Sequence, residues 1–174
     1  MNNVDISHLS ILIVDKNPLL RTVFRQVLRE LGARTVEAVS SVEAGFDAVR
    51  NRNPDIILAD WGPDCDGLGL LCRIRMDPQS PNPYVPVIVC SANTEAEAVL
   101  SARDMGMSEY LAKPVSAKSL YQRIARVVME QRSFVKTGEF FGPDRRRHED
   151  EADENSRRET ETALIASGAV AAPA

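Results

Sequence analysis

The chain has 174 residues, of which 44% are hydrophobic and 26% charged, which is typical of one globular domain with residues left over. Its net charge of −4 disfavours binding to nucleic acid or to an anionic membrane surface. An odd number of cysteines, the lack of a secretory-signal pattern and the lack of an apolar stretch of roughly 18–20 residues predict a cytoplasmic protein that does not insert into a membrane.

Five short apolar runs alternate with five segments of helical periodicity along the first 131 residues. Runs of this length, apolar at every position, are typical of parallel strands buried on both faces. The predicted strands are 11–14, 35–38, 55–59, 87–90 and 110–112. The predicted helices are 19–31, 41–50, 68–76, 94–105 and 116–131, with N-cap residues Asn17, Ser40 or Ser41, Asp66, Thr94 and Ser116. This alternation predicts a doubly wound α/β fold with a five-stranded parallel sheet.

Polar side chains follow four of the predicted strands. They are Asp15, Asp60, Ser91 and Lys113. Each alone could be a turn, a helix cap or a solvated end. Together they predict one site, because the carboxyl ends of parallel strands meet at the same edge of a sheet, where ligands bind in such folds.

Residues 132–174 differ in character from the domain at 8–131. They hold 7 basic and 9 acidic residues without long apolar periodicity, which predicts a largely disordered tail. Within the tail, the segment 134–147 (FVKTGEFFGPDRRR) combines three phenylalanines with three consecutive arginines. One hypothesis is that it docks its aromatic residues on the domain or on a partner, while Arg145–Arg147 contact an acidic surface. The alternative is a solvated linker.

Four motifs in register carry a resemblance to a known family. They are ILIVD at 11–15, PDIILAD at 54–60 with PDCDG after it, VIVCSA at 87–92 and YLAKP at 110–114. In these motifs the chain resembles the CheY-like response-regulator receiver family over its first 131 residues. The sequence FFGPDRRR resembles the tails of a subgroup of stand-alone receivers. The resemblance implies the flavodoxin-like strand order 2-1-3-4-5.

The resemblance also implies a role for each strand-end residue. Asp60 would be the phospho-acceptor nucleophile, Lys113 would pair with a phosphoryl oxygen, and Ser91 would donate a hydrogen bond to another. Ser91 and Tyr110 would form a conformational switch. Asp15, Asp60 and a backbone carbonyl, assigned here to Gly62, would hold Mg²⁺.

Two departures from the family pattern fall on the metal-binding loop. Lys16 stands where receivers carry a second acid, and Pro63 comes one residue early. Either the Lys16 ammonium lies near Asp15 and Asp60 and lowers the affinity for Mg²⁺, which we favour slightly, or it points into solvent. We expect Gly62 to compensate for the short loop through backbone angles closed to other residues.

Three further residues of this loop have predicted roles. Asp64 and Asp66 could add acidity, although Asp66 before a glycine is more often a helix cap. Trp61 is predicted to be a partly exposed lid over the site.

The favoured function is a single-domain response regulator of a phosphorelay, not an enzyme. It would accept a phosphoryl group on Asp60 from a histidine kinase or a histidine phosphotransfer protein and signal to a downstream protein as a monomer or weak homodimer. The first alternative is a degenerate receiver acting as a phosphorylation-independent adaptor. The second is a flavodoxin-like or phosphatase-like enzyme, which the sequence at 15–18 (DKNP) disfavours because it contains neither a Gly- or Thr-rich phosphate loop nor Asp-x-Asp.

Overall fold

A computed structural model of the chain describes residues 4–130, 132–138 and 140–144. Its main sheet has five parallel strands in the order β2-β1-β3-β5-β6, which confirms the predicted order because a short strand, β4 (Cys65–Asp66), intervenes only in the numbering. The parallel strands are β1 (Ser10–Val14), β2 (Thr35–Val39), β3 (Ile56–Gly62), β5 (Val87–Ser91) and β6 (Glu109–Ala112). The helices are α1 (Pro18–Glu30), α2 (Val42–Arg52), α3 (Gly67–Met76), α4 (Ala96–Asp104) and α5 (Ala117–Met129).

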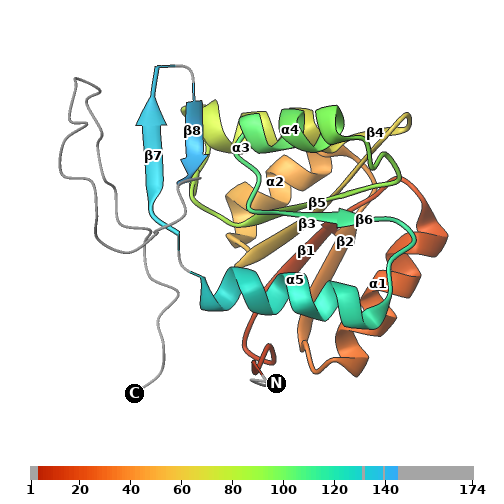
Figure 1. The fold of residues 1–174 in the computed structure, drawn as a ribbon. Helices are drawn as coiled ribbons and strands as arrows, with labels where there is room; N and C mark the ends of the chain where they lie inside the picture. Colours follow the sequence, from red (N-terminus) through yellow and green to blue (C-terminus); the bar gives the residue numbers. More distant parts are fainter. Residues whose placement is uncertain (1–3, 131, 139, 145–174) are drawn as a thin grey trace, which may run out of the picture.

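The sheet is buried on both faces, as its continuous apolar strands predict. In β1, Leu12 and Val14 face a core built with α2 and α3, whereas Ile11 and Ile13 face a second core built with α1 and α5. Figure 1 shows the two helical layers on opposite sides of the sheet. In the described part of the chain, no helix is both long enough and apolar enough to cross a bilayer.

Most of the helix starts agree with the predicted N-cap residues. Asn17, Ser41, Asp66 and Ser116 each accept a hydrogen bond from a backbone N–H of the first turn of their helix. The prediction of Thr94 is wrong: α4 begins at Ala96, and the residue before it makes no capping bond with its side chain.

An antiparallel hairpin that the sequence analysis did not predict follows α5. It consists of β7 (Phe134–Thr137) and β8 (Phe140–Pro143), and Gly138 in its turn has a φ of 50°. Figure 1 shows the hairpin at the end of the molecule opposite the carboxyl ends of the parallel strands. The remaining predicted tail, with Arg145–Arg147, lies outside the described residues.

An aromatic cluster fixes the hairpin to the domain. The rings of Phe134 and Phe141 lie edge-on to Tyr84, with centroids 5.2 and 5.3 Å away, and are themselves buried. The sequence analysis left two surfaces open for these aromatic residues, the domain and a partner protein. In the structure, Phe134 and Phe141 pack on the domain.

Arg75 lies beneath this cluster and is 5% exposed. Its guanidinium donates hydrogen bonds to three backbone carbonyls and lies 5.2 Å from the ring centre of Phe134. The carbonyls belong to Gly106, Pro83 and Val85. Burial lowers the pKa of Arg75 to about 9, so the group stays charged at neutral pH. The hairpin thus covers a buried cation.

Two glycines allow the backbone of the hairpin to pack closely against the backbone of the loop after α4. Gly106 has a φ of 89°, and a Cβ there would lie 2.6 Å from the carbonyl oxygen of Phe141. A Cβ at Gly142 would lie 2.6 Å from the Cα of Gly106. Larger side chains at either position would push the hairpin away from the domain.

Candidate functional site

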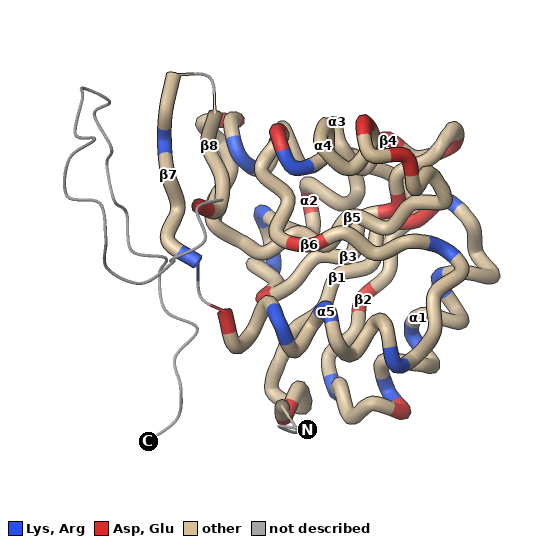
Figure 2. Tube along the Cα trace, viewed as in Figure 1, with Lys and Arg blue, Asp and Glu red and all other residues tan. Residues whose placement is uncertain are grey.

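Two carboxylates and one amine meet at the carboxyl ends of three strands. The Nζ of Lys113, just after β6, lies 2.6 Å from Oδ1 of Asp60 in β3 and 3.3 Å from Oδ2 of Asp15, which follows β1. The side chains of Asp15, Asp60 and Lys113 are 2%, 14% and 18% exposed. Figure 2 shows acidic residues gathered at this end of the sheet, near β4. The structure therefore brings together three of the four residues predicted from the strand ends.

The pKa values of the closest pair reflect both burial and charge. Burial raises the pKa of Asp60 above its ordinary value, and the charge of Asp15 adds to this effect, while the hydrogen bond from Lys113 opposes it. For Lys113, burial alone would lower the pKa, but the hydrogen bond to Asp60 and the two nearby carboxylates raise it overall. Lys113 is therefore a firmly protonated cation between two acids.

The loop after β1 is fixed by hydrogen bonds that hold Asp15 in place. One oxygen of Asp15 accepts a bond of 2.7 Å from the backbone N–H of Asn17. From the first turns of α1, Arg21 donates to the backbone carbonyls of Asp15, at 2.7 Å, and Lys16, at 2.9 Å. Sequence analysis missed Arg21, because nothing in a helical pattern marks a side chain that turns back toward the preceding loop.

Ser91 and Tyr110 both connect to the loop that follows β5. Ser91 is 2% exposed, and its hydroxyl accepts a hydrogen bond of 3.1 Å from the N–H of Asn93. It comes one residue after Cys90, which pairs with Asp60 across the sheet. The half-buried Tyr110 donates its hydroxyl to the carbonyl of Asn93. Both predicted switch residues thus contact the same loop residue.

The shortened loop after Asp60 folds into a two-residue hairpin. Strands β3 and β4 pair through Trp61 with Asp66 and through Gly62 with Cys65. The half-buried Trp61 packs against the core formed with α2 and α3, so it is partly core rather than only a lid. The prediction for the backbone of Gly62 is wrong, because its φ is not positive and a Cβ there would meet no atom within 4 Å.

Gly67 is the glycine that this loop requires. A Cβ at this position would overlap the backbone carbonyl oxygen of Asp60. Asp66, the residue before it, caps α3 by accepting a hydrogen bond of 2.8 Å from the N–H of Gly69. Its role as a cap is therefore confirmed.

The Lys16 ammonium points away from the acidic pair. The side chain is 63% exposed, and its ion-pair partner is Asp64, at 3.9 Å. The interpretation that we favoured slightly, with the ammonium between Asp15 and Asp60, is wrong, because Lys113 holds that position. The Lys16 side chain is long enough to carry its charge into solvent instead.

The donor set fits a divalent cation only in part. Mg²⁺ is commonly held by one or two carboxylates and several waters, which Asp15 and Asp60 could provide with a carbonyl of the loop. Among the described residues, no group of three His, Cys, Asp or Glu side chains converges on a possible metal position. Because position 16 is a lysine, the site has two carboxylates, those of Asp15 and Asp60, and no third one. These residues fit a cation that takes most of its ligands from water.

Comparisons with known proteins agree with this geometry. Residues 11–125 match the model of the response regulator receiver domain, and the chain belongs to that family. It is 26% identical over 121 residues to the chemotaxis protein CheY-3 of Vibrio cholerae, covering 69% of this chain and 92% of that protein. It is also 26% identical over 120 residues to the chemotaxis protein CheY of Pseudomonas aeruginosa, covering 68% and 95%.

Solved structures show the same likeness. A candidate response regulator from Chloroflexus aurantiacus is 26% identical, with a TM-score of 0.63 over 70% of this chain and 98% of that one. The receiver domain of a Francisella response regulator is 25% identical, with a TM-score of 0.61 over 68% and 94%. This chain is therefore a receiver domain homologous to CheY response regulators, a family of phosphoryl-accepting signalling proteins that typically bind Mg²⁺ at an acidic site.

Proposed function

We propose that this chain accepts a phosphoryl group on Asp60 from the phosphohistidine of a histidine kinase or phosphotransfer protein, and signals by protein contact in the cytoplasm. The contact that supports this most is the 2.6 Å ion pair between Lys113 and Asp60, beside the buried Asp15. A carboxylate beside a fixed cation supports the proposal, because phosphoryl transfer requires a nucleophile and a group that offsets the charge on the phosphoryl oxygens.

In the transfer step, a carboxylate oxygen of Asp60 forms a bond to phosphorus while the bond from phosphorus to the donor imidazole nitrogen breaks. The imidazole leaves with the electron pair and takes up a proton. Lys113 stabilises the negative charge on one phosphoryl oxygen, and the buried hydroxyl of Ser91 donates a hydrogen bond to another. No net oxidation or reduction occurs.

Asp15 and Asp60, with the carbonyl of Gly62, would hold Mg²⁺ during transfer. The ion would neutralise charge on the phosphoryl oxygens. Because position 16 supplies no third carboxylate, we expect the affinity for Mg²⁺ to be lower than in receivers with paired acids after the first strand.

The output would pass through the loop after β5. Both Ser91 and Tyr110 bind Asn93 in that loop, so movement of Ser91 toward a phosphoryl group would disturb the hydrogen bond that holds Tyr110. A change in Tyr110 alters the face of α4, β6 and α5, where a downstream protein would bind.

Intact-mass measurement tests this proposal. The full chain is incubated with a small-molecule phosphodonor and Mg²⁺, and the expected adduct is one phosphoryl group. The adduct should vanish in Asp60→Ala and persist in Asp64→Ala, a control in an 83% exposed side chain of the same loop. If the native chain forms no adduct, the proposal is contradicted.

A phosphorylation-independent adaptor is the second candidate. It is favoured by the missing third acid and by the ion pairs that Lys113 already makes with both carboxylates. In that case the native chain and Asp60→Ala would bind the same partner with equal affinity. Adding the phosphodonor would change neither of these two affinities.

A further inference from the structure

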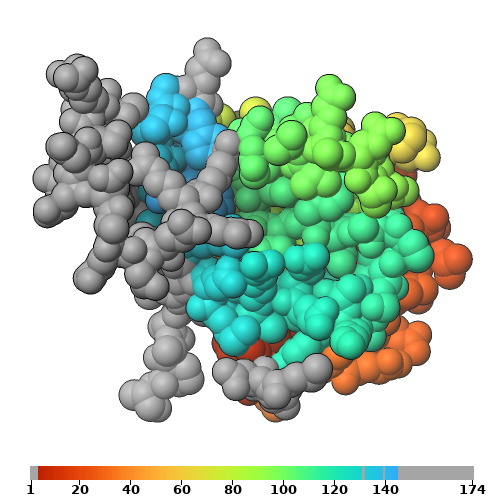
Figure 3. Space-filling model, in the orientation of Figure 1, coloured from red at the N-terminus to blue at the C-terminus, as the bar shows by residue number. Residues whose placement is uncertain are grey.

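The C-terminal hairpin β7–β8 contacts the domain at the loop that leads into β6. A Cβ at Gly142 of the hairpin would lie 2.6 Å from the Cα of Gly106, and a Cβ at Gly106 would lie 2.6 Å from the carbonyl oxygen of Phe141. In Figure 3 the hairpin, in blue, lies beside the green part of the domain that holds α4 and this loop. The loop 105–108 runs directly into β6, so the hairpin can restrain the position of that strand.

Arg75 connects the same loop to the hairpin through side-chain contacts. Its Nε donates a hydrogen bond of 3.1 Å to the carbonyl of Gly106, and its guanidinium lies 5.2 Å from the ring centre of Phe134 in β7. Its Nη1 donates to the carbonyls of Pro83 and Val85, which precede β5. One buried cation therefore joins α3, the loops before β5 and β6, and the first strand of the hairpin.

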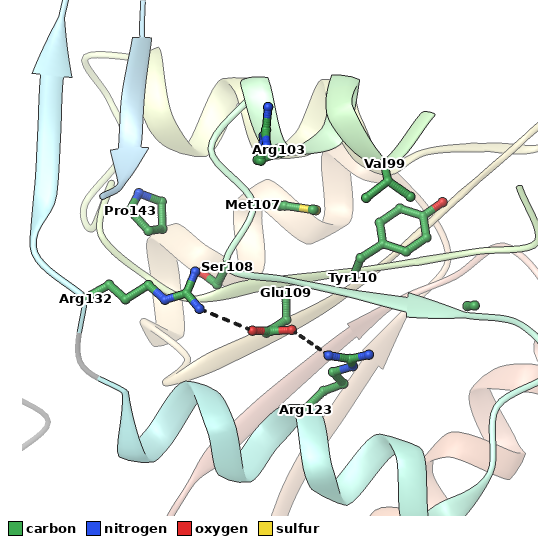
Figure 4. Close-up of a pocket in the computed structure, with 10 residues that line it drawn as sticks. Val99, Arg103, Met107, Ser108, Glu109, Tyr110, Arg123, Arg132 and Pro143 are labelled. Atoms are coloured by element: carbon green, nitrogen blue, oxygen red, sulfur yellow. Dashed lines mark hydrogen bonds and ion pairs between the residues drawn. The ribbon is translucent and has the colours of Figure 1, made fainter. Parts of the chain in front are cut away.

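A second link between the hairpin and β6 runs through Glu109, the first residue of that strand. The Glu109 carboxylate lies 3.8 Å from Arg132, two residues before β7, and 3.0 Å from Arg123 of α5. Figure 4 shows both ion pairs. Because the Glu109 side chain is only 9% exposed, salt screens these pairs less than pairs on an open surface. The start of β6 is thus bound both to the base of the hairpin and to α5.

Tyr110, the next residue of β6, reaches the other end of the sheet. Its side chain lines a groove of about 410 Å³ together with Val99 and Met107, so the ring has space to move (Figure 4). Its hydroxyl donates to the carbonyl of Asn93. Asn93 belongs to the loop at the carboxyl ends of the strands, whereas the hairpin lies at the opposite end (Figure 1). A displacement at the start of β6 can therefore reach the far loop through one side chain.

Two opposing contributions decide whether the hairpin stays docked. Burial of the rings of Phe134 and Phe141 favours the docked state. Burial of Arg75 opposes it, because no carboxylate among the described residues pairs with this cation and its Nη2 has no hydrogen-bond partner there. Water would reach the guanidinium if the hairpin moved away. Release is therefore less costly than the two phenylalanines alone would make it.

We propose that the hairpin β7–β8 is a releasable clamp on the face made by α4, β6 and α5. When docked, it holds the start of β6 and keeps Tyr110 bound to Asn93. When released, it frees the loop 105–108 and Glu109, and Tyr110 can leave Asn93 without a phosphoryl group on Asp60. The clamp lies within the chain and does not depend on phosphoryl transfer. Only the use of this face for output rests on the proposed function.

NMR of the full chain, without phosphodonor, tests the clamp. Phe141→Ala removes a ring that docks the hairpin, and Gly142→Ala separates the two backbones without opening a cavity. Both variants should shift the amide resonance of Asn93 and the ring resonances of Tyr110. Lys136→Ala, on the exposed side of β7, is the control and should leave these resonances unchanged. If Phe141→Ala does not fold, Gly142→Ala decides.

The coupling must also act in the reverse direction, because an interaction between two sites is reciprocal. Tyr110→Phe removes the hydroxyl that binds Asn93, and it should shift the amide resonance of Gly142 in the hairpin. Tyr121→Phe is the matched control. It removes a hydroxyl that binds the backbone of Val4 near the N-terminus, and it should leave the hairpin resonances unchanged.

Two outcomes would overturn the proposal. Shifts confined to the hairpin and to residues 105–109 would show a contact that transmits nothing to the far loop. An unchanged hairpin in Tyr110→Phe would show that the two ends are not coupled. All of these measurements use the unphosphorylated chain. A chain that accepts no phosphoryl group can therefore still show the coupling, and a chain that accepts one can lack it.

Discussion

Lys113 allows two carboxylates to sit close together at the end of a buried sheet. Asp15 is almost fully buried, and burial together with repulsion from the charge of Asp15 raises the pKa of Asp60. A protonated amine within 2.6 and 3.3 Å of the two acids offsets this repulsion and stays charged because those acids raise its pKa. The carboxylate of Asp60 is therefore held in an environment that disfavours its charged form.

Replacing Asp60 by Asn should stabilise the protein more at pH 7 than at pH 4. The folded-state pKa of Asp60 lies above the ordinary value for an aspartate, so the folded state binds more protons than the unfolded state between the unfolded and folded pKa values. Native stability therefore falls as the pH rises through that window, and Asp60→Asn avoids the loss. Urea unfolding at both pH values measures the difference. Asp47→Asn, at an exposed position of α2 away from the site, is the control, and a gain that shrinks toward pH 7 would contradict the assignment.

Gly67→Ala should destabilise the protein by about 1–3 kcal/mol, as overpacking usually does. The added methyl would overlap the carbonyl oxygen of Asp60, which cannot move without distorting β3. Gly62→Ala is the matched control, because its methyl would meet nothing within 4 Å. Thermal unfolding compares the two variants, and equal midpoints would disprove the close approach.

Lys16→Asp should bind Mg²⁺ several-fold more tightly than the native chain. The substitution removes a positive charge from the loop after β1 and supplies the carboxylate that the site lacks. Trp61, in the loop after Asp60, provides a fluorescence signal for the titration. Unchanged affinity would mean that position 16 does not contribute to the cation site, as its exposed side chain would allow.

The sequence predicted the strand-end residues because each one ends an apolar run, and parallel strands bring such ends together. It could not predict Arg21, whose contact with the loop carbonyls depends on the angle at which α1 leaves that loop. It also misplaced Lys16, because residue spacing does not show which of two lysines reaches the acids. The need for glycine at position 67 was missed, because the close approach of its Cα to the carbonyl of Asp60 leaves no pattern in the sequence.

At the scale of elements, the hairpin β7–β8 extends the receiver fold. Averaged over residues 132–174, the composition is polar and predicts a tail. Locally, however, FVKT and FFGP flank a Gly-Glu pair, which is a signal for a hairpin with glycine in its turn. The sequence analysis missed this signal because it averaged the composition over the whole of residues 132–174. The hairpin covers Arg75 and Tyr84 and meets the loop before β6.

Phe141→Ala should lower the free energy of unfolding by about 3 kcal/mol, near the low end for a buried phenylalanine. The ring is 8% exposed and packs against Tyr84 and Phe134, so its loss opens a cavity beside these two rings. Lys136→Ala, on the exposed side of β7, serves as the control and should be nearly neutral. Urea unfolding measures both, and a neutral Phe141→Ala would show that the hairpin adds no stability.

At the scale of the whole molecule, the two ends of the sheet carry different groups. The carboxyl ends of the strands carry Asp15, Asp60 and Lys113, whereas the opposite end carries the hairpin. Between them, the proposed switch residue Tyr110 follows Glu109 along β6, and Glu109 pairs with Arg132 just before the hairpin. The fold class and strand order were predictable from periodicity and family resemblance. The hairpin's docking was left open, because it depends on shape complementarity.

The most direct test of the central claim locates the phosphoryl group on the chain. After incubation with a small phosphodonor and Mg²⁺, borohydride reduction converts an aspartyl phosphate to homoserine, which peptide mass spectrometry then assigns to one residue. The ion pair with Lys113 predicts conversion at Asp60 alone. Conversion at Asp64 or Asp66, or none at all, would contradict it.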